Sequence, residues 1–266
     1  MTVRILLPSV VTLICLILIL PIAIVVILAF GDQNFLRFPP AGYSLRWFSA
    51  FFGDPNWRAA LWTSLEVAAM ACVISTVIGF LAAYAFVRKT FLGQVVLLST
   101  MMLPMIIPTV ITSVAMYFFS AQFNLIGSKV WLAICHAVIA LPVVLLILLS
   151  ALQSVEPNLE RAALSLGASQ ARMMITVVVP IAAPGIISAT LFGFLASFDE
   201  LIISLFLTTV ATQTLTVRIW NSLHLEVEPI IAAVSTFLIA VTALVLLLDA
   251  GLRQLRSSRA RHGQSH

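Results

Sequence analysis

Three acidic residues lie inside long apolar runs of this chain: Glu66, Asp199 and Glu200. A charged side chain at the centre of a membrane span costs about 2.5–3.5 kcal/mol on insertion scales, so such residues usually face a bundle interior or a cavity. The acids therefore predict an acidic lining for a path that a cation could follow. The alternative is that they are caps at the membrane interface or pair with Arg58 or Arg218.

Aromatic and imidazole side chains broaden this candidate chemistry. Phe198 and Trp220 could attract a cationic solute through their ring faces, although aromatic residues are also common at membrane interfaces. His136 lies among apolar residues, and we expect it to form an interhelical hydrogen bond to a backbone carbonyl rather than to bind a ligand. The candidate substrate path thus comprises Asp199, Glu200, Glu66, Phe198 and Trp220.

Sequence motifs for catalysis are missing from the chain. It contains no Gly-Lys pair, and hence no phosphate-binding loop of the form G-x-x-x-x-G-K-[ST]. It also lacks H-E-x-x-H, G-x-S-x-G and C-x-x-C, and its cysteines (Cys15, Cys72 and Cys135) all lie in apolar runs. We therefore expect a non-catalytic chain without a metal or cofactor of its own.

The segment 157–180 is the most polar interior stretch, and it predicts a helix, a tight turn and a second helix. Pro157 suits the first turn of a helix, Gly167 suits the left-handed position after its end, and Ser169 can cap a second helix that runs toward Pro180. One face of the first helix is apolar, with the spacing of Leu159, Ala162, Ala163 and Leu166.

The amino-acid composition indicates that these residues belong to a membrane protein. The chain has 266 residues, of which 62% are hydrophobic and 9% are charged, whereas soluble domains carry about 25% charged residues. Six apolar runs are long enough to span a bilayer, which takes about 20 residues, and we expect the first to be a retained helix rather than a signal peptide. The approximate runs are 5–30, 61–87, 95–119, 130–152, 181–207 and 229–248. The predicted fold is an all-α, polytopic membrane protein with six transmembrane helices.

The sequence also predicts the structure of two connections between the spans and a kink in the third span. The region 31–60 is the longest polar connection, with an amphipathic piece near 45–52, and 208–228 is expected to be a polar loop. Pro104 and Pro108 should kink the third span.

The distribution of basic residues predicts the orientation. Six spans place nine of the 14 basic residues on the side of both termini, and basic loops favour the cytoplasm. The side with five comprises Arg37, Arg46, Arg58, Lys129 and Arg218. The basic-rich side comprises Arg4, Arg88, Lys89, Arg161, Arg172, Arg253, Arg256, Arg259 and Arg261. Both termini and the 153–180 loop are therefore expected in the cytoplasm.

The segment 157–180 resembles the "EAA" loop of permease subunits in binding-protein-dependent ABC importers. That motif reads Glu-Ala-Ala, three residues, Gly, nine residues, Ile, one residue, Leu-Pro. Arg161 occupies the motif's Glu position here, and the acid comes one residue earlier, at Glu160. Matching positions are Ala162, Ala163, Gly167 and Pro180, with Val177 and Val179 in place of Ile and Leu. The resemblance implies a coupling helix that docks on an ATPase subunit through Glu160, Arg161, Ala162, Ala163, Gly167 and Pro180.

The resemblance extends over residues 61–250. It implies a type I ABC importer permease fold, in a single domain of residues 1–266 with a cytoplasmic coupling loop at 153–180 and a basic cytoplasmic tail at 251–266. It also implies a bacterial inner-membrane location and three kinds of partner: ABC ATPase subunits that hold ATP and Mg, a second homologous permease subunit, and an extracytoplasmic solute-binding protein. The segments Ser197–Glu200, Val217–Ile219 and Glu228–Pro229 are similar to the spermidine/putrescine branch of the family.

These features predict the transmembrane subunit of an ATP-driven importer for a small cationic solute such as putrescine or spermidine. One alternative is an importer permease for another small solute, such as an amino-acid-like compound or an organic anion. An ATP-independent secondary transporter would need its own coupling-ion site, typically in an inverted repeat, and the sequence shows no repeat. A purely structural subunit would leave the intramembrane acids unexplained.

Overall fold

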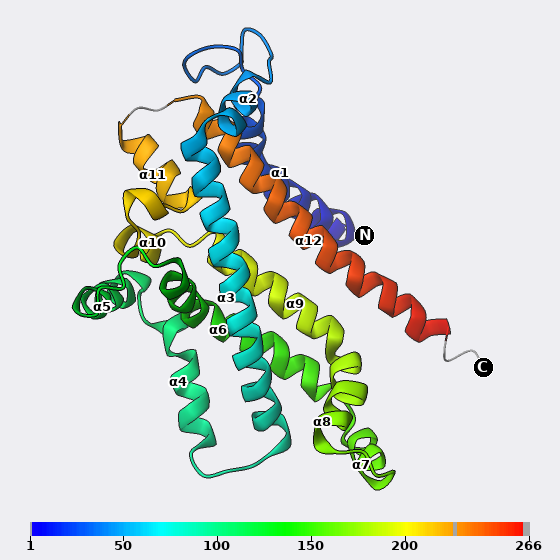
Figure 1. The fold of residues 1–266 in the computed structure, drawn as a ribbon. Coiled ribbons are helices and arrows are strands. Elements are labelled where there is room, and N and C mark those ends of the chain that lie inside the picture. The colour runs from blue at the N-terminus through cyan, green and yellow to red at the C-terminus, as the bar shows by residue number, and fades with distance from the viewer. Residues whose placement is uncertain (1, 226–227, 263–266) are drawn as a thin grey trace. The chain divides into compact units, whose positions relative to one another are not determined.

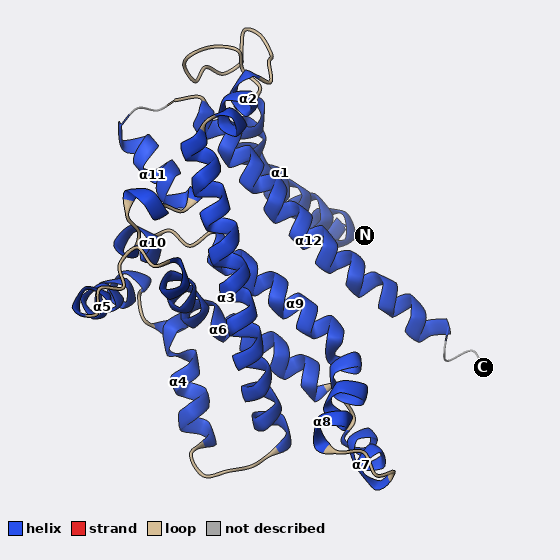
Figure 2. Cartoon of the chain, viewed as in Figure 1, coloured by secondary structure: helices blue, strands red, loops and turns tan. Residues whose placement is uncertain are grey.

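The computed structural model describes residues 2–225 and 228–262, with side chains described for residues 7–224 and 228–251. Helices form almost all of the regular structure in these ranges (Figures 1 and 2). The long helices are α1 (Thr2–Ala29), α3 (Pro55–Arg88), α6 (Lys129–Gln153), α9 (Val179–Phe198) and α12 (Ile230–His262). The shorter ones are α2 (Arg46–Gly53), α4 (Gln94–Ile106), α5 (Thr109–Gln122), α7 (Pro157–Ser165), α8 (Gln170–Met173), α10 (Ile202–Leu207) and α11 (Leu215–Leu225).

The predicted all-α membrane fold is confirmed. Within the described residues, five helical segments are long and apolar enough to cross a membrane, and a sixth candidate is a bent pair of helices, α4 and α5. Six spans are therefore obtained if this pair is counted as one.

The third span is broken rather than kinked, so the predicted single helix over 95–119 is wrong. The α4 and α5 axes meet at 102°. Ile107 is extended (φ −74°, ψ 132°), and Pro108 also leaves helical geometry, because a residue before proline is pushed away from the α region. Pro104, by contrast, is accommodated inside α4.

The fifth span also differs from the predicted helix over 181–207. Its helix starts earlier, at α8, passes through a π-helical turn (Met174–Val178) and continues as α9. It ends at Phe198, and a short break precedes α10. The Glu200 carboxylate accepts a hydrogen bond from the Ile203 backbone N–H at 2.9 Å. This contact caps α10 and favours a new helix start over continuation of α9.

The two polar connections contain more helix than expected. The amphipathic piece predicted near residues 45–52 is confirmed as α2. The region 208–228 was expected to be a loop, but it holds a 3-10 turn (Val210–Thr212) and the whole of α11 (Leu215–Leu225).

The chain divides into two compact units, and the first comprises residues 1–59 and 218–243. In this unit the small residues Ala29 and Ala233 are fully buried together. The Phe51 and Phe237 rings pack with centroids 5.5 Å apart. The Arg218 guanidinium lies 5.4 Å from the Trp57 ring centroid, so aromatic contacts organise this unit.

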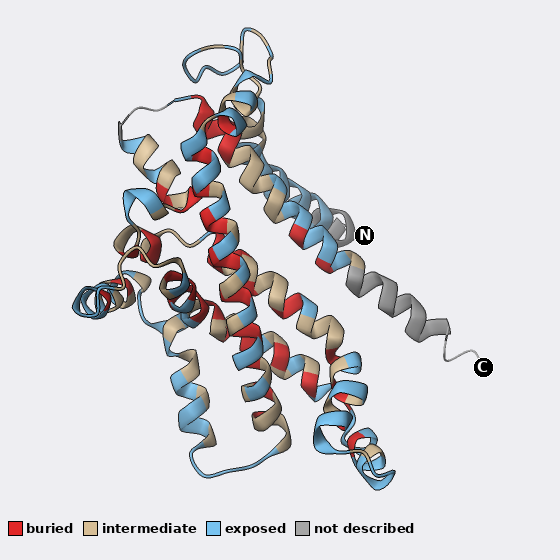
Figure 3. Ribbon diagram, viewed as in Figure 1, coloured by how far each residue is buried: buried red, intermediate tan, exposed pale blue. Residues whose placement is uncertain are grey.

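The second unit comprises residues 60–217 and 244–266. Its core forms where α6 packs along α9, and α6 carries buried residues along its length (Figure 3). Val144, Leu145 and Leu148 are fully buried there. The α7–α8 segment lies at one end of this unit, and α10 lies near the other (Figure 1). The 20 residues of α9, at about 1.5 Å each, separate the two ends by about 30 Å.

Candidate functional site

The segment 157–180 folds as the sequence predicts. Helix α7 begins at Pro157. Gly167 takes the left-handed conformation (φ +85°) in the turn that follows, and the Ser169 hydroxyl accepts a hydrogen bond from the Arg172 N–H at 3.2 Å. The helix start at Pro157, the turn at Gly167 and the cap at Ser169 thus agree with the sequence prediction.

Glu160 faces the interior of its own unit rather than the surface. Only 7% of the residue is exposed. Its Oε1 lies 2.7 Å from Arg88 Nε, and its Oε2 accepts a hydrogen bond from the Tyr84 hydroxyl at 3.0 Å. Both carboxylate oxygens of Glu160 are therefore engaged by side chains of α3.

The remaining predicted coupling residues are more open. Arg161, Ala162 and Pro180 are exposed, whereas Ala163 is half-buried against the core. A Cβ atom added to Gly167 would meet nothing within 4 Å. The exposed face also includes two large apolar residues, Leu159 (45% exposed) and Leu166 (89% exposed).

Asp199 and Glu200 lie in the break between α9 and α10, not inside a helix. Asp199 is exposed and Glu200 is half-buried. Desolvation by the surrounding protein raises the pKa of both carboxyl groups above their usual range. Among the described residues, no Lys or Arg side chain forms an ion pair with either acid.

The two aromatic residues predicted for the path, Phe198 and Trp220, pack against other rings. Phe198 is 1% exposed and stacks on Phe194 with ring centroids 5.4 Å apart, so it does not face a path in this structure. Trp220 is 41% exposed, belongs to the first unit, and its ring packs on His224.

Glu66 has a different partner from the two proposed in the sequence alternative. Its Oε2 lies 2.7 Å from Lys129 Nζ, and both side chains are substantially exposed. The carboxylate is thus half of a surface ion pair at the start of α6, rather than a partner of Arg58 or Arg218.

His136 joins three helices through two hydroxyl groups. Its Nδ1 lies 2.8 Å from Ser197 Oγ on α9, and its Nε2 lies 3.1 Å from Ser204 Oγ on α10. The expected backbone carbonyl partner is therefore wrong. The imidazole therefore bridges the break between α9 and α10. Ser197 and Ser204, which lie on either side of Asp199 and Glu200 in the sequence, are the residues that could have indicated this bridge.

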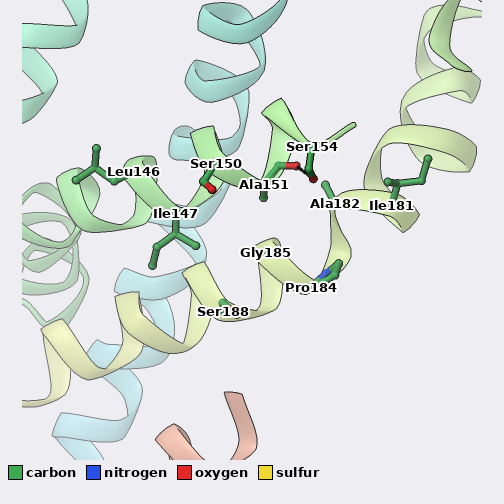
Figure 4. Close-up of a pocket in the computed structure, with 10 residues that line it drawn as sticks. All are labelled: Leu146, Ile147, Ser150, Ala151, Ser154, Ile181, Ala182, Pro184, Gly185 and Ser188. Carbon is green, nitrogen blue, oxygen red and sulfur yellow. Dashed lines mark hydrogen bonds between the residues drawn. The ribbon is translucent and has the colours of Figure 1, made fainter. Parts of the chain in front are cut away.

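An open cavity of about 550 Å³ lies between α6 and α9 (Figure 4). Its polar groups come from Ser150, Ser154 and Ser188, and none of the predicted path residues lines it. The Ser188 hydroxyl donates a hydrogen bond to the carboxylate of Asp249 on α12. Asp249 is 7% exposed and was missed in the sequence, although an acid in an apolar helix is a signal in itself.

Metal-binding geometry is not found in the described parts of the chain, where no cluster of His, Cys, Asp or Glu could hold an ion. Cys72 and Cys135 are buried and unbridged. The side chains of Glu160 and His136, by contrast, form polar contacts that join helices.

Comparison with known proteins decides the family. Residues 75–259 match the family described as binding-protein-dependent transport system inner membrane component. The chain belongs to this family. This permease is thus a multi-pass inner-membrane component of an ABC importer, as its "EAA" loop indicated.

Two relatives named as transport-system permeases match most of this permease. It is 28% identical over 259 residues to the putrescine transport system permease protein PotI of Escherichia coli (strain K12), with 91% of each chain covered. It is 26% identical over 233 residues to the spermidine/putrescine transport system permease protein PotC of Haemophilus influenzae, with 86% of this chain and 89% of that protein covered. Its resemblance to the polyamine branch is confirmed.

A solved structure supports the fold. The permease superposes on a chain of a bacterial ABC transporter involved in the import of the acidic polysaccharide alginate, with a TM-score of 0.77 and 14% identity. The match covers 93% of this chain and 95% of that chain. At this identity the similarity concerns the fold alone.

Proposed function

We propose that this permease couples an ATPase to solute transport through residues 157–180. The carrying observation is a helix–turn–helix that leaves Arg161 and Ala162 exposed at the "EAA" spacing. A small alanine lets another protein approach closely, and the flanking Leu159 and Leu166 offer apolar surface to a partner. Gly167 sets the turn between the two helices.

The proposed assembly contains a second permease subunit, two ATPase subunits with ATP and Mg, and an external solute-binding protein. The permease contributes a single non-catalytic domain over residues 1–266. Both termini and the 153–180 loop are placed in the cytoplasm by the basic bias. The Arg4 and tail arginine side chains, which contribute to that bias, lie outside the described residues. Reporter fusions at residue 266 and near Gly42 should report opposite sides of the membrane.

The proposed cargo is a small cation of the polyamine class. The relatives named for putrescine and spermidine support this class, as do the acids at the end of α9, where Asp199 is exposed. A carboxylate beside a low-dielectric bundle attracts a cation more strongly than one in bulk water. Glu200, Glu66 and Trp220 are secondary candidates for the same path.

The docking proposal can be tested with a matched pair of glycine substitutions. Gly167 and Gly93 both have φ near +85°, and an added Cβ meets nothing at either position. Valine strains this conformation equally in both turns, but only Gly167 lies in the proposed docking loop. Gly167→Val should reduce ATPase co-purification and uptake, whereas Gly93→Val should leave ATPase co-purification unchanged. Equal retention of the ATPase by both variants contradicts the proposal.

The cargo proposal is tested by uptake in cells that lack other polyamine importers and express the complete importer. Labelled putrescine should be taken up and should be displaced by spermidine. Uptake of an amino acid or an organic anion without any polyamine uptake would overturn the cargo class, while leaving the coupling proposal intact.

A further inference from the structure

Arg88, the last residue of α3, makes the most extensive set of polar contacts at the α7 end of the second unit. Its Nε lies 2.7 Å from Glu160 Oε1. One terminal nitrogen donates to the carbonyl oxygens of Val155 at 2.6 Å and Leu152 at 3.3 Å. The Arg88 and Glu160 side chains are only 12% and 9% exposed. A single guanidinium therefore connects the end of α3 with α7 and with the end of α6.

These contacts place the Arg88 guanidinium against backbone carbonyls and a carboxylate that face the protein interior. Leu152 belongs to the last turn of α6, and its carbonyl oxygen also accepts a hydrogen bond from the Val155 N–H at 3.2 Å. A cation at this end of a helix interacts favourably with the helix dipole. The carboxylate of Glu160 is largely removed from water, so it needs a charged partner.

Tyr84 completes the arrangement from one turn earlier on α3. Its hydroxyl donates to Glu160 Oε2 at 3.0 Å, while Arg88 occupies Oε1. Residues four apart share one face of a helix, so α3 presents a hydroxyl and a guanidinium side by side to one carboxylate. Both oxygens of Glu160 are engaged, which limits rotation of α7 against α3.

Neighbouring positions on α7 have opposite environments. Arg161 is exposed, while Glu160 is buried. Helix α7 has only nine residues, and isolated helices of that length are marginal in water. Its position therefore depends on contacts with the rest of the unit, and the contacts of Glu160 are the charged ones.

We propose that Tyr84, Arg88 and Glu160 form a clamp that makes α7 move together with α3 and the end of α6. These are positioning residues: they touch neither ATP nor solute, but they transmit a displacement at the docking face to two membrane-spanning helices. The proposal rests on the proposed function of α7 as the docking helix. It assigns Glu160 a role inside the permease instead of at the ATPase contact.

The test uses the complete importer in proteoliposomes, with ATP hydrolysis and solute uptake measured in the same vesicles. Arg88→Gln and Glu160→Gln should raise the amount of ATP consumed per solute by about tenfold, within the range by which coupling elements alter linked equilibria. Tyr84→Phe should cause a smaller rise, and Arg88→Lys should retain most of the coupling because it keeps the charge. Lys129→Gln breaks the ion pair with Glu66, the second one found among the described residues, and it should leave the ratio unchanged.

A purely structural role would lower uptake and hydrolysis together with the amount of assembled importer. Unchanged ratios in Arg88→Gln and Glu160→Gln would therefore overturn the clamp. If neither variant accumulates in the membrane, Tyr84→Phe decides, since it removes one hydroxyl only, and an unchanged ratio there also overturns the proposal. Ala162→Asp distinguishes failure of the docking proposal from failure of the clamp proposal. Full ATPase retention in Ala162→Asp contradicts docking itself. Lost retention in Ala162→Asp, together with an unchanged ATP-per-solute ratio in Arg88→Gln and Glu160→Gln, contradicts the clamp alone.

Discussion

The two ends of the second unit treat their carboxylates differently. At the α7 end, Glu160 is buried and engaged by Arg88 and Tyr84. About one α9 length away, Asp199 is exposed at a helix break and forms no ion pair within the described part of the chain. Glu160 belongs to a polar segment and Asp199 to an apolar run, and both are predicted site residues.

The contrast separates two uses of charge in one membrane protein. A buried carboxylate with a guanidinium partner holds helices in a fixed relation, and its charge is not available to a solute. A carboxylate without a basic partner contributes little to holding helices, but its field extends into the space that a solute can enter. Removing the charge of Glu160 should therefore mainly lower stability, whereas removing the charge of Asp199 should mainly lower uptake of a cationic solute.

The largest expected difference concerns stability. Glu160→Ala leaves the Arg88 guanidinium buried without its charge partner and should reduce the free energy of unfolding by about 3 kcal/mol. Asp199→Ala should change it by less than about 0.5 kcal/mol, as for other surface substitutions. Denaturation of the two variants in the same detergent measures both effects. Equal losses of unfolding free energy in Glu160→Ala and Asp199→Ala would contradict the distinction between the two ends of the unit.

The next prediction concerns transport by the opposite end. Asp199→Asn keeps the size of the side chain and removes the charge, so it should reduce uptake of a cationic cargo about fivefold, equivalent to about 1 kcal/mol of lost attraction. Glu200→Gln should have a smaller effect, because the amide oxygen can still accept the hydrogen bond from the Ile203 N–H that caps α10. Uptake is compared at equal permease abundance, with ATPase co-purification as the control.

Lowering the pH should have the same effect as Asp199→Asn. The pKa of Asp199 is raised by desolvation, so its negative charge is lost at a higher pH than that of an ordinary aspartate as the solution is acidified. Wild-type uptake should therefore decline on acidification more steeply than uptake by Asp199→Asn. Undiminished uptake by Asp199→Asn at neutral pH contradicts the cation-path assignment.

The smallest effect is expected at the surface ion pair. Glu66 and Lys129 have side chains that are 50% and 36% exposed, and exposed pairs contribute about 0.2–1 kcal/mol. Glu66→Gln should leave stability nearly unchanged and should lower cation uptake less than Asp199→Asn does. A reduction in uptake as large as that of Asp199→Asn would place Glu66 in the path, in spite of its ion pair with Lys129.

Local signals in the sequence predicted local structure well. Pro157, Gly167 and Ser169 act through their own backbone or their nearest neighbours, and each occupies its predicted position. The apolar runs indicated the spans for the same reason, since the requirement for about 20 apolar residues is independent of packing. Pro108 was identified as a disturbance of the third span, but the size of the bend, 102°, depends on how the following helix packs.

Partners distant in the chain could not be read from the sequence. Arg88 and Glu160 are 72 positions apart, and His136 is 61 and 68 positions from its two serines. Spacing along one helix gives no information about such pairs. The acid and base at residues 160 and 161 were both expected on the docking face, because periodicity alone does not reveal that Arg88 and Tyr84 would engage one of them from α3.

The family, the membrane setting and the helix–turn–helix of residues 157–180 were thus determined by the sequence itself, since composition, spacing and the preferences of proline and glycine act over short distances. The inward orientation of Glu160, the helix break at Asp199 and the bridge formed by His136 required the tertiary structure. A buried charge or hydroxyl takes whichever partner the packing of helices brings within hydrogen-bonding distance, because the cost of leaving it unpaired in an apolar interior is large.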